Sequence, residues 1–150
     1  RGKPKTLEFN CRLGDPETQP LLMRLKSDLF EVLWAATEPG PHGKLDQIEL
    51  EWDRRVALGV VLAAYGYPLS PRKGDAITGL PAAEADAVVF HAGTVRDADG
   101  TVRSSGGRVL CVTVLADKVK LAQQRAYEVV RGIHFDGMQY RRDIGHRAVK

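Results

Sequence analysis

Glu8 and Asn10 are the two residues of this 150-residue chain whose combined chemistry is easiest to name. They alternate with Leu7 and Phe9, so in an extended strand the polar side chains leave one face and the apolar side chains the other. A carboxylate and an amide oxygen are hard donors of the kind that Mg²⁺ accepts, together with waters and substrate phosphates. The pattern therefore fits a magnesium site, although polar residues two positions apart more often mark only a solvated strand edge.

Arg12 follows the expected strand, Lys5 to Asn10. Its planar guanidinium could bind phosphate or acyl-phosphate oxygens through two parallel hydrogen bonds, or it could be a surface arginine paired with Asp15 or Glu17. Asp15 and Pro16 indicate the start of a helix, because Asp accepts bonds from free amides and Pro suits the first helical position.

A second candidate anion site is Gly106-Gly107-Arg108. Two residues without a Cβ beside a guanidinium could form a cradle for a phosphate, whereas a tight turn between strands explains the glycine pair equally well. The run Tyr140 to Asp143 is interpreted as a solvated or interdomain face, with substrate contact as the minor alternative.

Metal-site and disulfide signatures are absent from the sequence. The histidines have no ligand spacing, and His91, between apolar neighbours, is interpreted as a strand residue with a bonded ring nitrogen. Cys11 and Cys111 lie far apart and outside any CxxC pattern, so reduced thiols are expected.

Composition indicates a globular protein. Hydrophobic residues make up 43% of the chain, no run approaches the ~18 apolar residues of a membrane span, and the N-terminal residues resemble neither a signal nor a transit peptide. We therefore expect a soluble cytoplasmic protein. The net charge is +3, but basic and acidic residues are interspersed, which favours small anionic substrates over nucleic acid.

Two parts of different character are expected along the chain. The first, 1–45, combines the strand at 5–10, a helix from Pro16 to about Leu25 and a second helix, capped by Ser27, over 28–37. The Pro- and Gly-rich break at 38–43 marks the boundary.

The second part, 46–150, has short strands and one closing helix. The helix is expected over 118–131, with Asp117 as its cap and an apolar stripe facing the core, and Asp97 to Gly100 signal a hairpin turn. The expected strands are 56–64, 76–78, 87–91, 94–96 and 108–115. This pattern predicts an α+β protein whose second part is a small β-rich domain closed by a helix.

The first residues of the sequence suggest a fragment. Arg1 to Pro4 has the composition of a hairpin turn whose first strand is absent, and the strand at 5–10 is too apolar to stand without a sheet to join. An upstream portion, on the same or another chain, is therefore an expected partner.

The stretch from Glu8 to Gln19 resembles the signature of the glycinamide ribonucleotide synthetase (phosphoribosylamine-glycine ligase) family, which are ATP-grasp enzymes of purine biosynthesis. Further segments resemble that family in the same order: Leu25 to Leu29, Gly79 to Pro81, Phe90 to Thr94, Gly106 to Thr113 and Tyr140 to Gly145.

The resemblance implies the C-terminal end of an ATP-grasp domain followed by the small β-rich domain. It implies ligation of glycine to 5-phosphoribosylamine through glycyl phosphate, with ATP as co-substrate and Mg²⁺ or Mn²⁺ held by Glu8 and Asn10. Arg12 would be catalytic and face substrate, and Gly107 and Arg108 would bind the ribose 5-phosphate. Without the upstream portion the chain is expected to be inactive.

Two alternatives stay open at this point. One is another ATP-grasp carboxylate-amine ligase with the same metal pair and a different acceptor. The other is a non-catalytic β-rich module that binds an anionic partner.

Overall fold

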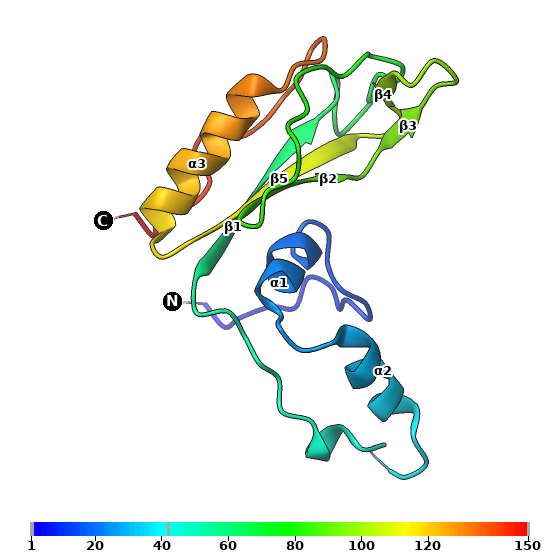
Figure 1. Cartoon of the computed structure of the whole chain (residues 1–150), viewed down its shortest axis with the longest axis vertical. Coiled ribbons are helices and arrows are strands. Elements are labelled where there is room, and N and C mark those ends of the chain that lie inside the picture. Colours follow the sequence, from blue (N-terminus) through cyan, green and yellow to red (C-terminus); the bar gives the residue numbers. More distant parts are fainter. Residues whose placement is uncertain (1, 42, 150) are drawn as a thin grey trace.

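A three-stranded antiparallel sheet forms the centre of the protein in the computed structural model, which describes residues 2–41 and 43–149 (Figure 1). β1 (Val56–Ala63) and β2 (Ala87–His91) pair with opposite edges of β5 (Arg108–Ala116). Seven consecutive residues of β5 are buried, so both faces of this strand are covered. A strand covered on both faces has a continuous apolar run rather than an alternating one. The expected strand at 87–91 is confirmed, and the other two differ from expectation by one residue at an end.

Helices cover both faces of this sheet. α3 (Val119–Gly132) packs on one face of β1 and β5, and α1 (Thr18–Arg24) lies against the same strands from the other side (Figure 1). The apolar stripe of α3 buries Ala122, Ala126 and Val130 completely, as its helical spacing predicts. On the opposite face, a Cβ at Gly59 would lie 3.2 Å from Sγ of Cys111 on the neighbouring strand and 3.8 Å from Pro20 of α1, so this face of the strand is packed beside the helix.

A separate two-stranded hairpin extends beyond the main sheet. β3 (Thr94–Arg96) is confirmed, and it pairs with β4 (Val102–Ser104) across the expected turn, in which Gly100 has a φ of +86°. The strand expected at 76–78 is wrong. Ala76 forms a single bridge with Arg103, and Thr78 forms a single bridge with His134. Because these two partners belong to different parts of the chain, the segment has no continuous neighbouring strand with which to pair.

The strand expected at 5–10 is also wrong. Residues 2–10 have no regular structure, and the side chains of Leu7 and Phe9 are 97% and 91% exposed. A strand needs a hydrogen-bonding neighbour, and none of the described segments pairs with this one. The hairpin turn expected at Arg1 to Pro4 includes Arg1, which lies outside the described residues.

All three expected caps need correction. α1 begins at Thr18, since the Asp15 carboxylate lies 3.4 Å from Arg108 and does not cap the helix. α2 (Leu29–Thr37) is capped by Asp28, whose Oδ1 accepts from the amide of Phe30, while Ser27 accepts from the amide of Glu51.

At the start of α3 the cap position is one residue later than expected. Lys118 occupies it, without a side-chain hydrogen bond, because the extended backbone continues through that residue and the helix begins at Val119. Asp117 therefore lies before the cap.

The segment between the two parts is held against α1. After η1 (Leu45–Gln47), Trp52 forms a bridge with Leu25, and the carbonyl of Asp53 accepts both Nε and Nη2 of Arg24 at 3.2 and 3.0 Å. The expected break after α2 is confirmed, because that helix ends at Thr37; the domain boundary there stays a prediction.

The mixed architecture, with antiparallel sheets and a C-terminal helix, confirms the α+β class. Within the described residues, no helix has both the length and the apolar character needed to cross a membrane.

Candidate functional site

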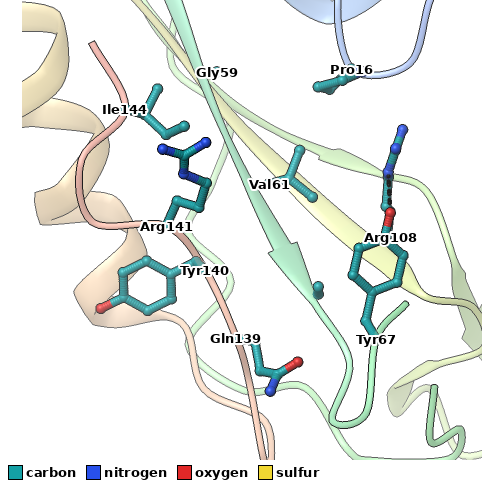
Figure 2. Close-up of a pocket in the computed structure, with 10 residues that line it drawn as sticks. Pro16, Gly59, Val61, Tyr67, Arg108, Gln139, Tyr140, Arg141 and Ile144 are labelled. Atoms are coloured by element: carbon teal, nitrogen blue, oxygen red, sulfur yellow. Dashed lines mark hydrogen bonds between the residues drawn. The ribbon is translucent and has the colours of Figure 1, made fainter. Parts of the chain in front are cut away.

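An open cavity of about 600 Å³ lies on the face of β1 that is turned away from α3 (Figure 2). Gly59, Val61 and Ala63 alternate along β1 and therefore share this face. The final segment of the chain runs along the free edge of β1, where Ala63 and Gln139 exchange backbone hydrogen bonds of 2.7 and 2.9 Å. The remaining lining residues are Pro16, Tyr67, Arg108, Tyr140, Arg141 and Ile144.

Arg108 is the cation on one side of the cavity. Its Nε donates to the Tyr67 hydroxyl at 2.9 Å (Figure 2), and its Nη1 donates to the Asp15 carbonyl. The bond to Tyr67 and the nearby Asp15 carboxylate raise the pKa of Arg108, so the side chain is a permanent cation. Its Nη2 makes no hydrogen bond with any residue that the structure describes.

Gly107 has a packing role in this arrangement. A Cβ at Gly107 would lie 2.6 Å from Cδ2 of Tyr67, so any larger residue would push the ring away from Arg108. Its carbonyl accepts from the amide of Ala64 at 2.9 Å, which fixes the connection between β4 and β5. The structure thus brings Arg108 into the cavity, with Gly107 supporting the tyrosine beside it.

Arg141 lines the cavity from the other side, on the segment that the sequence assigned to a solvated or interdomain face (Figure 2). Its Nε donates to Oδ1 of Asp143 at 2.9 Å and its Nη2 donates to Oδ2. This pair lowers the pKa of Asp143 and raises that of Arg141, so both groups stay charged near neutral pH.

Two side chains of α3 hold this segment in place. The Tyr127 hydroxyl donates to the carbonyl of Arg141 at 2.8 Å and accepts from the amide of Ile144 at 3.1 Å. Gln123 donates to the carbonyl of Ile144 at 2.7 Å. Sequence reasoning missed these positions; the one available signal was a tyrosine and a glutamine four residues apart on one helix face.

Glu8, Asn10 and Arg12 do not line this cavity. All three are exposed; Asn10 Nδ2 donates to Glu8 Oε1 at 3.3 Å, so the two side chains are adjacent even without a strand. Arg12 donates to the carbonyl of Leu13 at 3.2 Å, and no ion pair with Asp15 or Glu17 is present among the described residues.

Adjacent carboxylate and amide oxygens on an accessible segment fit part of a magnesium shell, which needs waters and phosphates for the rest. The described residues contain no group of three or more His, Cys, Asp or Glu side chains placed to hold a metal ion by themselves.

The readings of the other candidate residues hold. His91 ends β2, and its Nδ1 lies 3.0 Å from Oγ1 of Thr94, which confirms a strand residue with a bonded ring nitrogen. Cys11 is exposed and Cys111 is buried, and both are free thiols. His42, which like the other histidines has no metal-ligand spacing in the sequence, lies outside the described residues.

Residues 57–147 match the family described as phosphoribosylglycinamide synthetase, C domain. The chain is similar to phosphoribosylamine-glycine ligases from Ralstonia nicotianae, with 63% identity over 149 residues, and from Vibrio cholerae, with 56% identity over 149 residues. Each of these alignments covers 99% of this chain and 34% of the relative, so the chain spans about a third of their length.

A solved structure is also similar. The crystal structure of a phosphoribosylamine-glycine ligase from Thermotoga maritima superimposes with a TM-score of 0.72 at 37% identity, covering 95% of this chain and 34% of that one. The α+β arrangement described above is therefore also found in part of that ligase.

Proposed function

Because the chain belongs to the phosphoribosylglycinamide synthetase C-domain family, we propose that it forms the metal-binding and C-terminal part of a phosphoribosylamine-glycine ligase. The observation that carries this proposal is the family match over residues 57–147. The cavity beside β1, which holds a permanent cation, agrees with a phosphorylated substrate.

The proposed reaction has two steps. A carboxylate oxygen of glycine attacks the γ-phosphorus of ATP, and ADP leaves to give glycyl phosphate. The amine of phosphoribosylamine then attacks the acyl carbon, phosphate leaves and the nitrogen loses a proton, which gives glycinamide ribonucleotide. Because the reacting groups are anionic, fixed cations around them are the main source of catalysis.

Arg108 supplies such a cation for the ribose 5-phosphate, and Gly107 supports it by leaving room for Tyr67. Arg12 is exposed and bonded only to a neighbouring carbonyl among the described residues, so its guanidinium is available to the acyl phosphate.

Glu8 and Asn10 would hold Mg²⁺ or Mn²⁺, which when bound neutralises phosphate oxygens of ATP. The apolar side chains beside them, Leu7 and Phe9, are almost fully exposed. We infer that the two thirds of the relatives' length which this chain does not span cover this segment, bring ATP to it and complete the active site. A cytoplasmic location fits the two free thiols.

The test uses the complete ligase, meaning this chain together with the part of the relatives' length that it does not span. Replacing Arg108 by Gln should raise KM for phosphoribosylamine about 10- to 100-fold, since a hydrogen bond to a charged group contributes about 1.5–3 kcal/mol. KM for ATP should change little. Arg96→Gln is the control, because Arg96 lies on β3, donates to the carbonyl of Gly100 and does not line the cavity.

The outcomes separate the alternatives. Equal increases in KM for both substrates would assign Arg108 to domain closure rather than phosphate binding. ADP release that depends on a different acid or amine would indicate another ATP-grasp ligase. A complete protein without ATP-dependent ligation would overturn the proposal.

A further inference from the structure

We propose that Arg141 is a second substrate-binding residue, and that the cavity between Arg108 and Arg141 binds a phosphorylated sugar through its phosphate. This inference rests on the proposed function for the identity of the sugar, a ribose 5-phosphate. It adds Arg141, which lies more than 30 positions after Arg108 in the sequence. The resemblance of the segment around Arg141 to the family gave no role for this arginine.

The first argument is position. Arg108 comes from the start of β5 and Arg141 from the final segment, and both line the same cavity, with Val61 of β1 between them (Figure 2). The cavity volume of about 600 Å³ lies within the usual range of small-molecule sites, about 300–1,000 Å³. Its floor along β1 is apolar, so the strongest polar groups that a ligand meets are the two guanidinium groups.

The second argument is that Arg141 is oriented and still has a free donor. Asp143 binds Nε and Nη2, which fixes one edge of the guanidinium, while Nη1 has no hydrogen bond to any described residue. The side chain is 71% exposed, so this donor is accessible to a ligand. The two N–H groups of Nη1 on a charged guanidinium fit phosphate oxygens better than a neutral hydroxyl.

The third argument is that the backbone of Arg141 is anchored. Tyr127 binds its carbonyl at 2.8 Å and the amide of Ile144 at 3.1 Å, and α3, which carries Tyr127, is packed against the core. These bonds fix the backbone of the segment and so keep the Arg141 side chain at this side of the cavity. Tyr127 and Asp143 are therefore positioning residues for Arg141.

Charge gives the ligand class. A phosphate monoester carries about −1.5 to −2 charges at pH 7 and accepts charged hydrogen bonds from guanidinium groups, whereas a neutral sugar gains little from them. Asp143 and Asp15 each partly offset one arginine, so the site is not a general sink for polyanions. A small ligand with one phosphate and an uncharged body is the class that fits.

The test measures binding of ribose 5-phosphate and of ribose to the complete ligase by calorimetry. Arg141→Gln should weaken binding of ribose 5-phosphate about tenfold or more and leave ribose unchanged, and KM for phosphoribosylamine should rise without a matching rise for ATP. Arg141→Lys should restore part of the affinity, because it keeps the charge. Arg142→Gln is the matched control, since Arg142 is the exposed neighbour that does not line the cavity.

Tyr127→Phe should produce a smaller loss of ribose 5-phosphate affinity than Arg141→Gln, as expected for a positioning residue. Unchanged affinity for ribose 5-phosphate in Arg141→Gln, or an equal loss for ribose, would overturn the inference. A wild-type protein that binds ribose 5-phosphate through Arg141 but does not ligate glycine would instead overturn the proposed function alone.

Discussion

Residues 2–41 and residues 56–147 differ in how many of their apolar side chains are buried. In the first region Ala35, at 7% exposure, is the only buried hydrophobic residue among those that the structure describes, and large apolar side chains of α2 and of the segment at its start face solvent. In the second region the sheet and α3 enclose a continuous core, which includes Phe135 at 1% exposure.

The candidate site residues are divided between these two regions. Glu8, Asn10 and Arg12 lie on the exposed region, where few contacts within the chain hold them. Arg108 and Arg141 are attached to the packed region, where the sheet, α3 and Tyr127 fix them. The first set therefore needs a partner surface for its geometry, whereas the second set has most of its geometry in this chain.

The largest expected effect breaks the packed region. Phe135→Ala should lower the free energy of unfolding by about 3–5 kcal/mol, because it removes a buried ring and leaves a cavity in the core. Phe9→Ala should change it by about 0.5 kcal/mol or less, because that ring is already exposed. Urea unfolding of the chain, followed by circular dichroism, measures both. Comparable losses for the two variants would show that the first region is packed in solution.

A second, smaller effect concerns activity in the exposed region. Glu8→Ala should reduce kcat of the complete ligase about 100-fold or more, because a metal ligand that stabilises phosphate charge is lost. The free energy of unfolding of the chain should not change, since Glu8 is exposed and its side chain hydrogen-bonds only with Asn10 among the described residues. Glu49→Ala, at another exposed glutamate, is the control. Normal turnover of Glu8→Ala at ordinary magnesium concentrations would end the ligand assignment.

The same contrast explains what the sequence could and could not predict. The strands β2 and β3 were predicted to the residue, and α3 was displaced by one position, because hydrophobic period and turn residues act locally. The alternation at Leu7 to Asn10 is just as regular, yet no strand forms there. Alternation predicts which face a strand would bury, but not whether a neighbouring strand exists.

The site was predicted only in part, for a related reason. Arg108 could be proposed from its glycine neighbours, but the cavity combines residues 16, 59, 61, 63, 67, 108, 139–141 and 144, which only tertiary packing brings together. The packing of Gly107 against Tyr67 could not be predicted, because the tyrosine is 40 positions away, and the phosphate-binding role of Gly107 stays a prediction. The caps failed because the predicted oxygens of Asp15 and Ser27 are used by distant partners.

A third prediction sharpens the comparison through the two cysteines. Cys11 lies on the exposed region, whereas Cys111 is buried in β5, where burial raises the pKa of its thiol. Because the thiolate is the reactive form, Cys111 should react with a thiol reagent at least about tenfold more slowly than Cys11. Mass spectrometry of timed samples measures the two rates, and Cys11→Ser and Cys111→Ser variants assign them. Equal rates in folded protein would mean that β5 opens as readily as the first segment.

The smallest expected effect lies at the junction of the two regions. The backbone of Asp53 pairs with Arg24 of α1, and its carboxylate accepts from the side chain of Arg55 at 2.7 to 3.1 Å and from the backbone amide of Arg55 at 2.8 Å. These bonds lower the pKa of Asp53 from its ordinary value of 3.8 to about 2. Arg55 also donates to Asp86, so one arginine ties the junction to the residue just before β2.

The sign of the pH dependence follows from this lowered pKa. The folded state holds its proton less tightly than the unfolded state, so the stabilisation by the Asp53–Arg55 pair is complete above pH 3.8 and disappears as the pH falls toward 2. Carboxyl NMR titration should show an Asp53 midpoint near 2, which Arg55→Gln should move toward 3.8. Asp86→Asn is the control, because it removes the other carboxylate and leaves the pair intact. A midpoint near 3.8 in the wild type would mean that this pair does not form in solution, and that the junction is as loosely held as the first region.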